Sequence, residues 1–335
     1  MYAIKRTTFT FLFLLSILLI GCIESAADSP YPPITFEKKA SFPGKGLASA
    51  ISFVINDKAY VVFGRNFETI CTNECWQYEP VEDKWTKNKD IPLTARVKAI
   101  AAVVNGKAYV GLGYNLEKAD GVRNDPGILK DFWMYDPILD SWTQKADFPT
   151  NATDGCVSFV INNDIYICGG FHGEGFTRDS WKYNTLTNQW EQTVNLPGRF
   201  RAVAVCCSDS LHIFYGTGFH DADSKNDWWE YSPQNKTWTE KKTMPDNGRA
   251  NAVALSINNR YFVSTGRHFG GELTGGHVKS DILEFDASRN VWYKRGNMPT
   301  SGRENAIAFT IKGKGYVGLG ENDTNAMNDL WSFEP

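Results

Sequence analysis

The chain has 335 residues, with 35 Lys and Arg against 38 Asp and Glu and a formal charge of −3. This balance argues against the strongly basic face of a nucleic-acid groove, and an apolar content of 42% excludes a disordered chain. The 11 Trp and 29 Gly, beside only 5 Met, favour many short strands joined by tight turns.

The N-terminus has the pattern of an export signal. Two cations precede an apolar run, Phe9 to Ile20, which has the length of a signal-peptide core and is short for a membrane span. The run ends in Leu19-Ile20-Gly21-Cys22, which resembles the lipobox of bacterial lipoproteins, where cleavage precedes an acylated cysteine. We expect residues 1–21 to be a signal peptide and 22–33 a tether after lipidated Cys22. The alternative is an ordinary secretory signal that contains a cysteine. Either way, the chain is exported, and the lipobox predicts attachment to a bacterial membrane on its periplasmic or cell-surface side.

Six further cysteines follow in a compartment where disulfides can persist. Cys71 and Cys75 are close enough to close a small loop, and this is the pairing that we favour. Cys156 and Cys168 fall on strands expected to be adjacent and are a second candidate pair. We expect Cys206-Cys207 to be apolar thiols on opposite sides of a strand. The spacings match no zinc framework.

A repeat organises the rest of the chain. Each copy has two alternating strands, a third strand with two aromatic or apolar residues, a turn, and a fourth strand with a Trp. These three residues recur as Trp76, Tyr78 and Trp85; Trp133, Tyr135 and Trp142; Trp181, Tyr183 and Trp190; Trp229, Tyr231 and Trp238; and Leu283, Phe285 and Trp292. Successive fourth-strand Trp are 57, 48, 48 and 54 residues apart. The second strand ends in a glycine in all six copies, at Gly64, Gly113, Gly170, Gly218, Gly266 and Gly320.

Four strands per ~50 residues with these aromatic and glycine positions resemble the kelch-type β-propeller over the whole mature chain. The double glycine of that family survives only at Gly169-Gly170. The last copy stops at Trp331-Ser332-Phe333 without a fourth strand, and Phe36 lies 49 residues before Trp85, where that strand's aromatic would fall. We predict one all-β domain over 34–335, a six-bladed propeller whose last blade is closed by the N-terminal strand, and expect it to be monomeric.

The same repeat assigns many conspicuous side chains to structure. Ten of the 11 Trp occupy the two repeated positions, which indicates packing between blades. An acid precedes the third strand in every copy, at Glu74, Asp131, Asp179, Asp227, Asp281 and Asp329. We expect these acids to bind turn amides rather than to catalyse.

Alternating strands place the b–c loops and the d–a connections on one face, named here the loop face. Functional residues favour loops on a rigid scaffold, so we expect the ligand there. The candidate ligand-binding residues are Arg65, Arg96, Tyr114, Phe171, His172, Arg199 (with Arg201 as its alternative in the same connection), Phe219, His220, Arg249, Arg267 and Arg303. Several arginines around one rim suit a carboxylate or a sulfate. The alternative is that the arginines after the fourth-strand Pro are structural.

His172, His220 and His268 are 48 residues apart and therefore equivalent on three blades. They are either metal ligands, general bases or polar rim residues. Because no carboxylate is spaced to orient them, we predict no metal and no cofactor.

Two functions fit these features. The first is a membrane-anchored protein that binds a carbohydrate or a protein partner, and no nucleic acid, through the loop face. The alternative is an enzyme, because the chain is similar in length, export and blade count to the sialic acid mutarotases, the N-acetylneuraminate epimerase family. That resemblance implies anomer interconversion of an acidic sugar. It would use Arg199, Arg249 and Arg303 to hold the carboxylate, and Glu304, Glu321 and His268 as the catalytic candidates.

Overall fold

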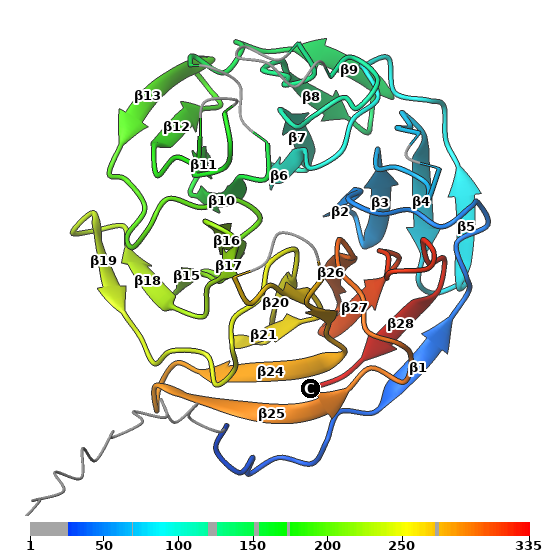
Figure 1. The fold of residues 1–335 in the computed structure, drawn as a ribbon. Helices are drawn as coiled ribbons and strands as arrows, with labels where there is room; N and C mark the ends of the chain where they lie inside the picture. The colour runs from blue at the N-terminus through cyan, green and yellow to red at the C-terminus, as the bar shows by residue number, and fades with distance from the viewer. Residues whose placement is uncertain (1–25, 69, 120–125, 151–153, 173–174, 272–274) are drawn as a thin grey trace, which may run out of the picture.

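The computed structural model describes residues 26–335, apart from residue 69 and the segments 120–125, 151–153, 173–174 and 272–274. The regular structure of this part of the chain is β-strand, in six four-stranded antiparallel sheets and two small hairpins. Figure 1 shows the six sheets as blades around a common axis. The innermost strands contact one another in cyclic order, so the ring is closed. No helix in the described ranges is long and apolar enough to cross a membrane.

Blades one to five each take four strands in chain order. Blade one contains β2 (Ile51–Ile55), β3 (Lys58–Val62), β4 (Cys75–Glu79) and β5 (Lys84–Lys87). Blade two contains β6 (Ile100–Val104), β7 (Lys107–Gly111), β8 (Phe132–Asp136) and β9 (Ser141–Gln144). Blade three contains β10 (Val157–Ile161), β11 (Asp164–Cys168), β12 (Ser180–Asn184) and β13 (Gln189–Thr193). Blade four contains β14 (Val205–Ser208), β15 (Ile213–Gly216), β18 (Trp228–Ser232) and β19 (Thr237–Glu240). Blade five contains β20 (Val253–Ile257), β21 (Arg260–Ser264), β24 (Asp281–Asp286) and β25 (Val291–Asn297). The b–c loops of blades four and five carry the hairpins β16 (Phe219–His220) with β17 (Asp223–Ser224) and β22 (Arg267–His268) with β23 (His277–Val278).

The sixth blade joins the two ends of the chain. It combines β26 (Ile307–Ile311), β27 (Lys314–Gly318) and β28 (Leu330–Phe333) with β1 (Phe36–Lys39). Phe36 is the register partner of Phe333, as Trp85 is the partner of Tyr78 in blade one. The predicted closure by the N-terminal strand is therefore confirmed, with Phe36 in the place of the missing fourth-strand Trp. Ring closure removes the free edges that a linear array of sheets would have.

The repeated aromatics pack within blades and between them, as predicted. The rings of Tyr78 and Trp85 are 5.0 Å apart, and Tyr78 also lies 5.9 Å from Tyr316 of the neighbouring blade. The Trp85 indole donates to the Ala40 carbonyl at the end of the adjoining outer strand. The additional Trp228 is fully buried against Phe214 and Trp292.

Two consecutive residues with positive φ end the second strand of every blade. In blade three they are the double glycine, whereas the first residue of the pair is Phe63, Leu112, Thr217, Thr265 or Leu319 in the other blades. A Cβ on Gly113 would lie 2.5 Å from the Val97 carbonyl oxygen, so the second residue has to be glycine. The first position only has to tolerate the left-handed conformation, which explains why the double glycine is lost elsewhere.

All six cysteines of the described chain are free thiols, so the expected Cys71–Cys75 and Cys156–Cys168 disulfides are wrong for this structure. Burial raises the pKa of Cys75 and of Cys168 to about 12 each, as expected for inert core thiols. Burial also raises the pKa of Cys206 and Cys207, which fits their predicted role as apolar thiols. The predicted signal peptide and the lipidation site at Cys22 lie outside the described residues.

Candidate functional site

Six equivalent residues on the loop face form what we call the axial ring: Arg65, Tyr114, Phe171, Phe219, Arg267 and Glu321. Each follows the positive-φ pair and forms an antiparallel bridge with the d–a connection that leads into its blade. The bridge partners are Ala48, Val97, Asp154, Ala202, Ala250 and Glu304. The ring contains five of the predicted ligand residues and one predicted catalytic residue, so the structure brings these six positions together on one face.

A closed circle of backbone hydrogen bonds fixes the axial ring from inside. The residue after each bridge partner has a positive φ, and its N–H donates to the carbonyl of its counterpart in the preceding blade. These six residues are Ser49, Lys98, Gly155, Val203, Asn251 and Asn305, joined at 2.7–3.4 Å. Because every N–H and every carbonyl in this circle is used, the six blades are locked together where a ligand would contact them.

One half of the axial ring is charged. Glu321 accepts hydrogen bonds from Arg65 at 2.7 Å and from Asn305 at 2.8 Å. Glu304 accepts from Arg267 Nε at 2.5 Å and from Asn251 at 2.7 Å. The backbones of Glu304 and Glu321 bond to each other, which makes the two carboxylates neighbours, and they are only 8% and 6% exposed.

Arg267 is the most heavily paired cation of this half. It contacts Glu304 and, through its Nη2, Asp323 at 2.5 Å. Burial alone would lower the pKa of Arg267, but these two carboxylates outweigh burial and raise it. A permanently charged, preorganised guanidinium therefore lies beside Glu304.

The other half of the axial ring is aromatic. Phe171 lies 5.5 Å from Phe176, Phe176 lies 6.1 Å from Phe219, and Phe219 lies 5.1 Å from Phe269. The Arg267 guanidinium lies 6.0 Å from the Phe269 ring. A continuous row of rings therefore runs from blade three to blade five and ends at the charged half. Phe176 and Phe269 escaped the sequence analysis because they lie in irregular loops outside the repeat.

Three of the predicted ligand arginines lie inside the blades instead of at the rim. Arg96, Arg249 and Arg303 are 0% exposed, and each makes two bonds to the acid before the third strand of its blade, Asp131, Asp281 and Asp329 respectively. Arg201 makes the same contact with Asp227 and replaces Arg199, which is exposed, as the equivalent of this set. Each of these arginines also binds the carbonyl of the first positive-φ residue, such as Leu112 for Arg96.

Their geometry corrects two expectations. A fully buried guanidinium that is paired with a carboxylate offers no exposed donor to a ligand at the rim, so Arg96, Arg249 and Arg303 support the blade and the alternative structural interpretation holds for them. The acids before the third strand make structural contacts other than turn amides. Asp131, Asp227, Asp281 and Asp329 each bind a buried arginine. Glu74 binds Lys87 and the Trp76 indole, and Asp179 accepts from Asn195. Asp329 also accepts from the Trp331 indole.

The three equivalent histidines do not share one set of contacts. His220 Nε2 lies 2.7 Å from Asp221, and His268 Nδ1 lies 3.2 Å from the Gly248 carbonyl. The His268 ring also lies 5.5 Å from that of His277. Burial, Lys279 and His268 lower the pKa of His277, which favours its neutral form. Among the described residues, no group of three or more His, Cys, Asp or Glu is placed to hold a metal ion.

Comparison with known proteins agrees with this architecture. The family described as Kelch motif matches residues 152–197. A search of the curated proteins gave no match. Among solved structures, the chain titled "Structure of YjhT" is similar with a TM-score of 0.73 and 19% identity, covering 87% of this chain and 96% of that one. The blades, the closure and the repeated motif together make this chain a kelch-type six-bladed β-propeller.

Proposed function

We propose that the protein is an exported lipoprotein that binds a carbohydrate at the axial ring. The observation that carries this proposal is the division of the ring into an aromatic half and a charged half. A sugar presents C–H groups on one face of its ring and hydroxyl or carboxylate groups at its edge. The Phe171–Phe219 row suits the former, and Arg65, whose side chain is 22% exposed beside Glu321, suits the latter.

The rigid circle of backbone bonds beneath the ring favours binding, because little conformational entropy is lost when a ligand docks on a preorganised surface. Attachment through Cys22 would hold this site at the membrane. A glycan array probed with the full-length chain tests the proposal. Binding to glycans that is lost in Phe219→Ala supports it. An apolar side chain remote from the ring and 81% exposed, Leu186→Ala, is the control, and an array without binders contradicts the proposal.

A second function, mutarotation of an acidic sugar, is favoured by the neighbouring carboxylates of Glu304 and Glu321. Anomer interconversion opens the sugar ring: a base takes the proton of the anomeric hydroxyl while an acid gives one to the ring oxygen, and closure on the other face reverses both transfers. Two acids that lie together, each beside an arginine, provide groups for both transfers and cations for the sugar carboxylate.

Proton NMR of freshly dissolved sialic acid tests this second function. A faster approach to the anomeric equilibrium that disappears in Glu304→Gln and in Glu321→Gln supports it. An unchanged rate with wild-type protein, together with binding on the array, would leave the carbohydrate-binding function alone.

A further inference from the structure

The face opposite the axial ring, named here the turn face, carries an unusual set of exposed aliphatic side chains. It is formed by the short a–b turns of all six blades and the short c–d turns of blades one to five. Val81, Ile138, Leu139 and Leu186 lie at the tips of the c–d turns of blades one to three and are 80%, 89%, 71% and 81% exposed. Large apolar side chains with so much exposed surface on three neighbouring turns indicate an interaction surface.

Hydrogen bonds fix the backbone of the turns that carry these aliphatic side chains. The N–H groups of Val81, Ile138 and Leu186 donate to the side chains of Glu79, Asp136 and Asn184, two residues earlier, at 3.0–3.2 Å. A hydroxyl of the third strand binds the far end of each turn, as Tyr183 binds Asn188 at 2.7 Å. The turn backbones that carry the apolar tips are therefore fixed, so that little backbone entropy is lost on insertion into a partner.

The aliphatic tips of the c–d turns are confined to blades one to three, while on the second side Leu211, in the a–b turn of blade four, is 69% exposed. At the position equivalent to Val81, Ile138 and Leu186, blade four has Gln234 and blade five has Ser288. The chain's N-terminal segment reaches the turn face on this second side instead. Ala27 donates its N–H to Trp292 of β25, and Ile34 donates to Arg295.

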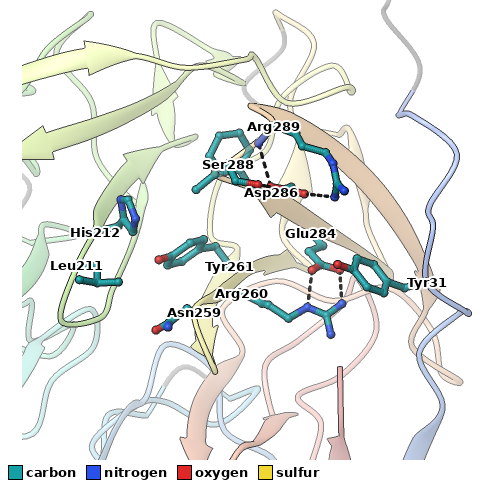
Figure 2. A pocket seen from close by; sticks show the side chains of 12 residues that line it. Tyr31, Leu211, His212, Asn259, Arg260, Tyr261, Glu284, Asp286, Ser288 and Arg289 are labelled. Carbon is teal, nitrogen blue, oxygen red and sulfur yellow. Dashed lines mark hydrogen bonds and ion pairs between the residues drawn. The ribbon is translucent and has the colours of Figure 1, made fainter.

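Tyr31 attaches that segment to the turn face of blade five. Its ring lies 4.4 Å from the Arg260 guanidinium, which starts β21 directly after an a–b turn, and 5.2 Å from that of Arg295. Figure 2 shows Tyr31 beside the ion pair of Arg260 with Glu284, at a pocket bordered by the c–d turn residues Asp286 to Arg289. Cys22 precedes the first described residue by only four positions, a reach of at most ~14 Å.

We propose that the turn face rests on the phospholipid bilayer, with Val81, Ile138, Leu139 and Leu186 inserted between the lipids and the axial ring pointing away. The proposal rests on the lipid anchor at Cys22. The anchor then holds the blade-five side of the turn face, and the aliphatic tips hold blades one to three on the opposite side. Two attachments on one face fix an orientation that a flexible tether alone would leave free.

Site-specific fluorescence of the full-length chain in vesicles of phosphatidylethanolamine and phosphatidylglycerol tests this orientation. A polarity-sensitive label is placed at Leu186→Cys, at Gln234→Cys as the equivalent position of blade four, and at Glu117→Cys on the loop face. We expect lipids with a quencher in the acyl chain to quench the Leu186 label strongly and the Glu117 label hardly at all, with the Gln234 label between them. Equal quenching of the Leu186 and Glu117 labels overturns the proposal.

Two further measurements separate the orientation from the anchor. Flotation with the vesicles and the mass of the N-terminal peptide report the acylation of Cys22. A chain that does not float contradicts the anchor and the orientation together, whereas a floating chain with an unquenched Leu186 label contradicts the orientation alone. In the triple variant Val81→Ser, Ile138→Ser and Leu186→Ser, we expect flotation to persist and the quenching of a label at Leu139→Cys to fall at least about threefold, because most of the inserted apolar area is gone.

Discussion

Replacing Arg303 with methionine distinguishes a structural arginine from a ligand-binding one. Arg303 is fully buried, and its guanidinium makes two bonds to Asp329, at 2.7 and 2.8 Å, and a third to the Leu319 carbonyl at 2.9 Å. The Asp329 side chain is only 20% exposed and keeps one other donor, the Trp331 indole. The substitution therefore leaves a largely buried carboxylate without its cation, which costs about 3–5 kcal/mol.

That loss is large enough to measure by thermal unfolding. With an unfolding entropy of about 2.1 cal/mol/K per residue over roughly 300 residues, it lowers the Tm by about 5–8 °C. Arg199→Met is the matched control, because Arg199 was predicted for the same role but is exposed, and its substitution should change stability by less than about 0.5 kcal/mol. Calorimetry of both variants is the assay. An Arg303→Met protein that keeps the wild-type Tm but no longer binds ligand would refute the structural assignment.

Three further predictions follow from the same contacts. Phe36→Ala removes the aromatic that closes the sixth blade, 5.3 Å from Phe333, and should cost about 1.5–3 kcal/mol in urea unfolding; an unchanged midpoint would show that the closure does not stabilise the ring. Burial alone would raise the pKa of Asp329, but the Arg303 pair and the Trp331 hydrogen bond outweigh it and lower the pKa below the ordinary value of 3.8. The stability that this lowered pKa contributes is fully present above about pH 4 and is lost as the pH falls toward the folded-state pKa. The urea midpoint of Asp329→Asn should therefore fall less steeply below pH 4 than the midpoint of the wild-type protein. Parallel pH profiles of the two midpoints would contradict this. Because the six described cysteines are free thiols, a reductant should leave the Tm unchanged, and a thiol reagent should label the four buried ones, Cys71, Cys75, Cys168 and Cys207, only after unfolding; a Tm that drops on reduction would show instead that a disulfide such as Cys71–Cys75 is present.

The architecture was predictable from the sequence because each blade repeats the same residue types at the same positions. Tyr, Trp and Gly recur at fixed positions, since blade packing and the close approach behind Gly113 accept few alternatives. Phe36 was recognisable as the closing residue because it falls in the repeat position of Trp85. The absence of the double glycine from five repeats does not change their backbone, because Leu112 and its counterparts adopt the same positive φ as Gly169.

The repeat in the sequence indicated which residues form the axial ring and the d–a connections beside it, but not the direction in which each side chain points. Arg303 and Glu304 are neighbours in one d–a connection, and both were candidates. Neighbouring residues of an extended chain point to opposite sides, so Arg303 enters the blade while Glu304 meets Arg267 and Asn251. The aromatic row was only partly predictable, because Phe176 and Phe269 belong to loops whose path depends on tertiary contacts.

Titration of N-acetylneuraminate into the protein, followed by calorimetry, tests the central claim that the axial ring is a site for an acidic sugar. We predict saturable binding by wild type, lost in both Arg65→Met and Phe219→Ala, which change the charged and the aromatic half separately, and retained in Val81→Ser on the opposite face. Binding that survives both axial-ring substitutions, or no binding by the folded wild-type protein, would contradict the claim.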